Sequence, residues 1–161
     1  MKYSLVVIFS LLFLSAGFAS CEEDPSGGSK PEAGNTNGND TPNPTGSKMK
    51  IRFGTNTFTA TLFDNASATA FKALLPLTIN MRDLNSNEKY YDFSAGLPTN
   101  AVKPGTIKSG DLMLYGSRTL VLFYKTFPTS YSYSRLGHIN DPEGLAAALG
   151  SREVTVTFEL E

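Results

Sequence analysis

Regular alternation of polar and apolar residues is the feature that most restricts how this chain can fold. One such segment spans residues 57–62. There, threonines alternate with Phe58, Ala60 and Leu62, so that one face is polar and the other apolar. This period of two is typical of a half-buried β-strand and not of a helix. The same alternation recurs in the segments 50–53, 77–82 and 153–160.

Turn signals and apolar runs predict the remaining strands. Gly54-Thr55-Asn56 closes a hairpin between the first two strands, and Gly116-Ser117 closes another one further along. The run 120–124 is apolar on both faces, which is typical of a central strand. Further strands are expected at 89–93, 111–115, 119–125 and 136–139, and a loop is expected at 98–110.

Two short helices are expected between the strands. Asp64-Asn65 offers a cap for a helix over 66–75. Asp141 offers a cap for a second helix, with Pro142 at its first position and Gly150 at its end. Many strands with two short helices predict a mainly β fold in the form of a closed β-barrel, because closure hides the edges of the sheet.

The N-terminal residues 1–20 have the composition of a secretory signal peptide. Lys2 supplies a positive charge, the segment 5–14 is apolar apart from one serine, and small residues follow it. This apolar run is shorter than the roughly 20 residues of a membrane-spanning helix. We therefore expect residues 1–20 to act as an export signal.

The only cysteine of the chain follows this segment directly. The tetrapeptide Phe18-Ala19-Ser20-Cys21 resembles a bacterial lipobox, in which two small residues precede a cysteine that becomes lipidated; phenylalanine stands here where leucine is usual. The resemblance implies that Cys21 becomes an acylated N-terminus, and two or more acyl chains hold a protein stably on a membrane. The alternative is a free thiol left by ordinary signal cleavage.

A polar segment follows the cysteine. Glu22-Glu23-Asp24 resembles the signal that sends some Bacteroidetes lipoproteins to the cell surface, although three acids also suit a solvated linker. The segment 25–47 consists largely of Gly, Pro, Asn, Ser and Thr, and Ala33 is its only aliphatic residue. It cannot bury enough apolar surface to offset its ordering entropy. We expect a disordered tether at 21–47, a folded domain at 48–161, and a location at the outer membrane or cell surface.

Four segments of the domain resemble the small bacterial cyclophilin-like domain family. They are 59–81, 89–93, 110–127 and the C-terminal 136–160, LGHINDPEGLAAALGSREVTVTFEL. Cyclophilins likewise end with a Gly-containing strand, a short helix and a final strand. The resemblance implies a barrel of the eight-stranded type that is capped by helices. It implies no particular activity, because the family has no established common reaction.

Cyclophilins isomerise X-Pro bonds with an arginine from a Phe-His-Arg strand motif and a pocket of aromatic residues. In this chain the corresponding strand reads Ile79-Asn80-Met81-Arg82, which makes Arg82 the candidate. The Phe-His pair is absent, and the chain has no tryptophan. Efficient isomerisation is therefore not expected. The other interpretation of Arg82 is a solvated strand residue paired with Asp83 or Glu88.

Tyrosines and an arginine in the second half are candidates for a ligand-binding surface. Tyr131 and Tyr133 lie in the polar stretch that ends at Arg135, and Tyr115 and Tyr124 precede it. Tyrosine offers a flat ring and a hydroxyl at low entropic cost, which suits peptides and sugars. Alternatively, these tyrosines only cover the barrel wall.

Metal, cofactor and nucleic-acid sites are not expected. His138 is the only histidine, and the aspartates are dispersed among turns, which matches neither a transition-metal site nor a calcium loop. No glycine-rich phosphate loop or nucleophile motif is present. The net charge is −1 and the basic residues are scattered, which argues against a nucleic-acid partner.

These features predict a membrane-tethered, cyclophilin-like domain that binds an extended peptide or a similar ligand without efficient catalysis. Arg82, the four tyrosines named above and Arg135 are the expected ligand-binding residues. Two alternatives stay open. One is a prolyl isomerase that acts on exported proteins. The other is a surface carbohydrate-binding protein, for which the absence of tryptophan is mildly adverse.

Overall fold

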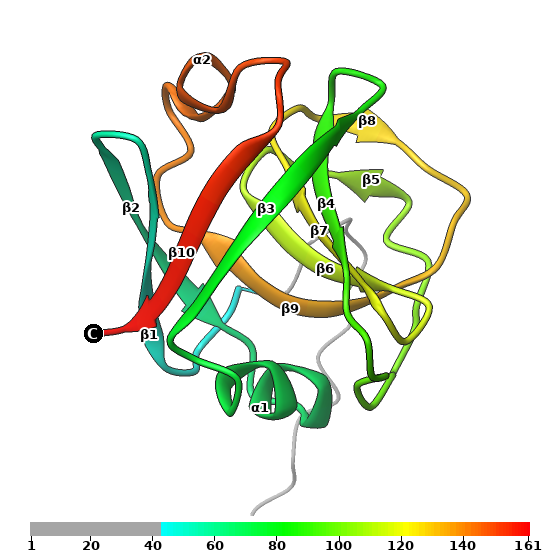
Figure 1. Ribbon diagram of the computed structural model, residues 1–161. Coiled ribbons are helices and arrows are strands. Elements are labelled where there is room, and N and C mark those ends of the chain that lie inside the picture. Colours follow the sequence, from blue (N-terminus) through cyan, green and yellow to red (C-terminus); the bar gives the residue numbers. More distant parts are fainter. Residues whose placement is uncertain (1–42) are drawn as a thin grey trace, which may run out of the picture. The chain divides into compact units, whose positions relative to one another are not determined.

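A closed barrel of antiparallel strands confirms the expected fold class (Figure 1). The computed structural model describes residues 43–161, and the predictions for the signal peptide and for Cys21 lie outside these residues. Around the barrel the strands follow the order β1-β10-β3-β4-β7-β6-β9-β2, and every neighbouring pair is antiparallel. Within residues 43–161 no helix has the length and apolar content needed to cross a membrane.

Most of the expected strands are present, with small shifts at their ends. The barrel consists of β1 (Lys48–Phe53), β2 (Asn56–Leu62), β3 (Leu77–Leu84), β4 (Glu88–Asp92), β6 (Asp111–Tyr115), β7 (Thr119–Phe123), β9 (Tyr133–Ile139) and β10 (Val154–Leu160). A separate two-stranded sheet pairs β5 (Thr106–Ile107) with β8 (Phe127–Pro128). The helices are α1 (Ala66–Lys72) and α2 (Leu145–Leu149).

The chain joins the barrel slightly before the predicted start of the domain. Gly46 N donates to Leu62 O at 2.8 Å, and Leu62 N donates to Ser47 O at 2.9 Å. A Cβ atom at Gly46 would lie 2.6 Å from Leu62 O, so only glycine fits this close approach. These bonds extend the pairing of β1 with β2 by two residues toward the N-terminus.

Two apolar clusters explain why the run 120–124 is apolar on both faces. Leu120, Leu122 and Tyr124 point into the barrel and belong to its main core. Val121 and Phe123 point outward into a second cluster. That cluster also contains Ile107 of β5, Met113 of β6 and Tyr133 of β9, with Phe127 of β8 packed against it. The small β5–β8 sheet therefore covers part of the outer wall formed by β6 and β7.

The expected loop at 98–110 was wrong in part, because it contains β5. Strands β5 and β8 have two residues each, so they are too short to show any periodicity in the sequence. Strand β9 also begins earlier than expected, at Tyr133 instead of Leu136. Its first residues are polar in composition, yet Tyr133 and Ser134 are buried because they pair with β6.

Helix α1 begins as predicted and ends early. The Asn65 side chain caps it by accepting a hydrogen bond from Ala68 N at 2.9 Å. The helix ends at Lys72 instead of reaching residue 75. Leu74 N donates to Phe71 O, so the hydrogen bonds at this end of the helix join residues three apart instead of four.

The predicted cap of α2 is wrong. This helix begins at Leu145, after Gly144, whose φ of 74° lies in the left-handed region. Asp141 Oδ1 instead accepts a hydrogen bond from Glu143 N at 3.1 Å. Asp141 therefore closes a local turn before the helix, a role that its side chain fills as readily as a cap.

Candidate functional site

The main candidate site is a cleft of about 590 Å³ on the outer face of the barrel. Its lining residues come mainly from β4, β6, β7, β8 and β9 and from the β3–β4 turn. Its volume is in the range of small-molecule and peptide-side-chain pockets. The lining combines four tyrosines, several hydrogen-bond acceptors and an apolar strip: Leu84, Asn85, Asn87, Glu88, Tyr90, Asp92, Tyr115, Thr119, Val121, Phe127, Pro128, Thr129, Ser130, Tyr131 and Tyr133.

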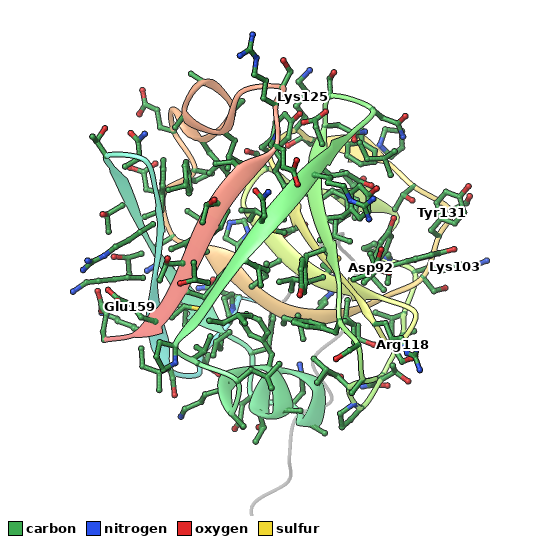
Figure 2. The ribbon with its side chains drawn as sticks, in the orientation of Figure 1. Asp92, Lys103, Arg118, Lys125, Tyr131 and Glu159 are labelled. Carbon is green, nitrogen blue, oxygen red and sulfur yellow. The ribbon has the colours of Figure 1, made fainter. Side chains whose placement is uncertain are left out.

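Three of the predicted tyrosines form one wall of this cleft. The Tyr115 ring lies 6.1 Å from that of Tyr131 and 5.6 Å from that of Tyr133, centroid to centroid. Tyr133 is buried, and its ring makes an edge-to-face contact with Phe123 at 5.5 Å. Tyr115 and Tyr131 remain 47% and 62% exposed. The Tyr115 ring thus contacts both the buried Tyr133 ring and the exposed Tyr131 ring, and Figure 2 shows Tyr131 at the outer edge of the molecule.

Hydrogen-bond acceptors gather at another part of the cleft. The Asn87 Oδ1 atom is buried and lacks a hydrogen-bond partner among residues 43–161. Burial, together with the negative charge of Asp83, raises the pKa of the neighbouring Glu88 carboxyl. Asn87 is the last residue of the β3–β4 turn and Glu88 is the first residue of β4, and Asn85 and Ser86 in that turn adopt positive φ values of 52° and 54°. An unpaired amide oxygen and a poorly solvated carboxyl are well suited to receive donors from a ligand.

Arg82 lies next to the cleft but does not line it. Its side chain points outward from β3 as predicted, and its Cζ atom lies 4.7 Å from the centre of the Tyr90 ring. Its Nη2 atom is 3.3 Å from Asp92 Oδ2. The ion-pair partner is thus Asp92, whereas the sequence suggested Asp83 or Glu88. Tyr90 and Asp92 both line the cleft, so Arg82 contacts two residues of its wall.

Tyr124 lies inside the barrel and is not part of the cleft. Its hydroxyl donates to Asp83 Oδ2 at 2.6 Å. Lys89 Nζ, which is fully buried, donates to the same Asp83 oxygen at 2.7 Å and to Arg152 O at 2.6 Å. Tyr124, Asp83 and Lys89 therefore form a buried polar network at one end of the barrel.

The pKa values of this network follow from its hydrogen bonds. Burial raises the pKa of the Asp83 carboxyl, but hydrogen bonds from Lys89 and Tyr124 and the charge of Lys89 outweigh it, and the pKa lies below its ordinary value. Burial and the hydrogen bond to Asp83 raise the pKa of Tyr124 far above its ordinary value. At neutral pH Asp83 is therefore charged and Tyr124 is neutral.

Arg135 lines a different cavity, of about 110 Å³, between α1, β9 and the segment 100–102. His138 is also separate from the cleft, since its Nδ1 atom lies 2.9 Å from Asp111 Oδ1 on β6. Among residues 43–161, no group of three or more His, Cys, Asp or Glu side chains is arranged to hold a metal ion. The structure thus brings together three of the six predicted binding residues, places Arg82 beside them, and separates Tyr124 and Arg135 from them.

Sequence reasoning did not identify the acceptors of the cleft. Tyr90 and Val121 had a usable signal, because they alternate with the inward-facing Lys89 and Leu122 along β4 and β7. Asn87 and Glu88 had no such signal. Asn87 ends an irregular turn and Glu88 begins β4, and the pairing of β4 with β7 brings both beside the tyrosines.

Comparisons with known proteins agree with the barrel. The sequence profile of the Cyclophilin-like family matches residues 51–159, which is more than half of the chain. Among solved structures, the solution structure of the hypothetical protein AF2241 from Archaeoglobus fulgidus is similar, with a TM-score of 0.51 and 17% identity. The similarity covers 72% of this chain and 95% of that chain, and at this identity it shows the fold alone.

A search of curated proteins gave no match. The profile match nevertheless begins within the first strand of the barrel, ends within the last one, and includes everything between them. The chain belongs to the Cyclophilin-like family.

Proposed function

We propose that the cleft binds an extended peptide segment and does not catalyse its isomerisation efficiently. The observation that carries this proposal is the row of three tyrosine rings, in which Tyr115 contacts both the buried Tyr133 and the exposed Tyr131, in the same cleft as the unpaired Asn87 oxygen. An extended peptide presents apolar side chains and backbone N–H donors along one line. The tyrosine wall suits the apolar side chains of such a peptide. The acceptors at the β3–β4 turn suit its backbone N–H donors.

The charges of the cleft favour a peptide with a basic side chain. Within residues 43–161, the ionisable acids that line the cleft are Glu88 and Asp92, and no Lys, Arg or His lines it. Arg82 pairs with Asp92, which leaves Glu88 as the carboxylate that gains most from a ligand cation. Since burial already raises the pKa of Glu88, a neighbouring ammonium group would relieve an existing cost of ionisation.

Efficient catalysis is not expected from Arg82 in this arrangement. Catalysis requires contacts that are stronger in the twisted peptide bond than in the planar one. The Arg82 guanidinium already contacts the Asp92 carboxylate and the Tyr90 ring, and its side chain is 57% exposed. The guanidinium is therefore not held in a desolvated position directed at a peptide bond, from which a cation stabilises a transition state.

Binding is tested by fluorescence anisotropy with two labelled peptides. One is Ala-Ser-Lys-Pro-Phe-Ser-Ala, and the other carries glutamate in place of lysine. We expect the lysine peptide to bind up to about fivefold more tightly at pH 7, which is the range of a solvent-accessible ion pair. Tyr131→Ala is expected to weaken both peptides by about tenfold, because this substitution removes an exposed aromatic contact.

Matched variants separate binding from folding. Glu88→Gln should abolish the preference for lysine without destabilising the protein at pH 7, because a raised pKa means that ionising Glu88 costs stability above its ordinary pKa. Leu160→Ala removes an apolar side chain that is 43% exposed on β10, away from the cleft. It should bind both peptides like the wild type. If Tyr131→Ala also binds both peptides like the wild type, the proposed site is wrong.

We also propose that Cys21 anchors the protein to a membrane through its acylated N-terminus, on the lipobox resemblance of residues 18–21. Exported proteins in the cell envelope would then be the source of the peptide segments. Cys21→Ala is expected to move the protein from the membrane fraction to the soluble fraction of the expressing bacterium. Unchanged membrane association of that variant would contradict the proposed anchor. It would not test the proposed peptide-binding site.

A further inference from the structure

The cavity beside α1 contains two buried polar groups that the fold itself leaves unpaired. Ser67 is 1% exposed, and its Oγ atom has no hydrogen-bond partner among residues 43–161. The Arg135 Nη1 atom is also buried and unpartnered among these residues. Both residues line the same cavity of about 110 Å³. Buried polar groups are nearly always satisfied in folded proteins, so two unpaired groups on residues that line one cavity indicate an occupant.

The local structure holds these two groups in place. The Asn65 Nδ2 atom donates to Arg135 O at 3.0 Å, and Asn65 Oδ1 accepts from Ala68 N, so one side chain ties the first turn of α1 to β9. Phe63 N donates to Leu136 O at 2.9 Å just before the helix. Helix α1 packs on β9 as a result (Figure 1). These hydrogen bonds and this packing therefore fix the walls of the cavity.

A third segment forms the outer rim of the cavity. Asn100 N donates to Ser134 Oγ at 2.8 Å, and Val102 pairs with Tyr133 through both backbone bonds. The segment 100–102 thus crosses β9 next to Arg135. Asn100 and Val102 are both exposed, so the cavity opens to solvent on this side.

We infer that this cavity binds a carboxylate group. Both unpaired atoms can donate: Arg135 Nη1 carries N–H groups in a planar fork that matches a carboxylate, and Ser67 Oγ carries a hydroxyl proton. No Asp or Glu lines the cavity, so no residue there repels an anion. The cavity's other walls include Phe63 and Val102, which suit the short apolar part attached to a carboxylate.

The volume of the cavity is large enough to hold a small organic acid group. One water needs roughly 10–15 Å³ of such space, so about 110 Å³ accepts a group of several non-hydrogen atoms. The carboxylate belongs either to a free short-chain acid or to an acidic side chain of another protein. This site is separate from the tyrosine cleft, since no residue lines both.

The test is an NMR titration of the ¹⁵N-labelled protein with sodium acetate, in which sodium chloride is withdrawn to keep the ionic strength constant. We expect saturable shifts at the amides of Ser67, Ala68 and Arg135. A parallel titration with N-acetyl-aspartate amide, which carries the same group on a peptide unit, distinguishes the two sources. Tighter binding of acetate assigns the site to free acids, and tighter binding of the blocked aspartate assigns it to acidic side chains.

Two variants and one control complete the test. Arg135→Gln is expected to weaken acetate binding about tenfold or more, and Ser67→Ala about threefold, because a charged donor contributes more than a hydroxyl. Ser67→Ala also removes an unpaired buried hydroxyl, so it should fold at least as stably as the wild type without ligand. Arg118→Gln changes an exposed arginine that lines neither cavity and should bind like the wild type. Shifts that rise linearly without saturation, or saturable shifts unchanged in Arg135→Gln and Ser67→Ala, would overturn the inference.

Discussion

Replacing Lys89 with alanine is expected to destabilise the protein by about 3–5 kcal/mol at pH 7, because the change leaves a buried carboxylate without its partner. Lys89 is fully buried, and Asp83 keeps only 14% of its side-chain surface exposed. The ammonium group also satisfies Arg152 O at 2.6 Å, which would lose its donor. Chemical unfolding in urea measures the loss directly.

The size of this effect should depend on pH. In the wild type the pKa of Asp83 is lowered, so its stabilising contribution is present above the ordinary aspartate pKa and is lost as the pH falls through the folded-state value. Without Lys89, two of the contributions that lower the Asp83 pKa are lost, whereas burial still favours the protonated carboxyl. The stability difference between wild type and Lys89→Ala should therefore shrink below about pH 4.

Two further variants distinguish the ion pair from the loss of packing. Lys89→Met keeps most of the side-chain volume but lacks the charge, so it should lose stability at pH 7 as well. Lys50→Ala removes an exposed lysine whose Nζ atom lies 4.0 Å from Glu161 Oε1, and its cost should stay below about 1 kcal/mol. A Lys89→Met protein as stable as the wild type at pH 7 would show that Asp83 does not depend on the ammonium group.

Phe71→Ala is expected to cost about 3–5 kcal/mol, because it opens a cavity where α1 packs on the barrel. Phe71 is fully buried, and its ring meets that of Phe158 edge to face at 5.7 Å. Leu74 follows the same helix but is 41% exposed, so Leu74→Ala should cost less than about 1 kcal/mol. The comparison is made by thermal and urea unfolding; equal costs for the two variants would contradict the described packing of α1.

The pattern of the sequence predicted the barrel because alternation reports directly which face of a strand is buried. The threonine-rich β2 was interpreted correctly on this basis, whereas β7 was recognised because the run 120–124 is apolar on both faces. Lys89 shows the limit of the method. It occupies an inward-facing position, and nothing local indicates that Asp83, Tyr124 and a distant carbonyl oxygen will satisfy its charge there.

The candidate site could be predicted only in part for a related reason. Tyr115, Tyr131 and Tyr133 are conspicuous in the sequence, and the pairing of Tyr115 with Tyr133 brings their strands together. Tyr124 looked equivalent to them in the sequence. It follows β7 directly and lies on the inner face, one residue out of phase with Phe123. The sequence also could not show that Arg82 pairs with Asp92, because this contact depends on the register of β3 against β4.

An NMR experiment with the X-Pro peptide Ala-Ser-Lys-Pro-Phe-Ser-Ala tests both halves of the proposed function at once. Amide shifts of the labelled protein report where the peptide binds, and exchange between the cis and trans peptide signals reports catalysis. We expect saturable shifts at Asn87, Tyr115 and Tyr131, and little or no acceleration of the exchange. Saturable shifts confined to residues outside the cleft would contradict the binding site. Strong acceleration that Arg82→Ala abolishes would show instead that the protein is a prolyl isomerase.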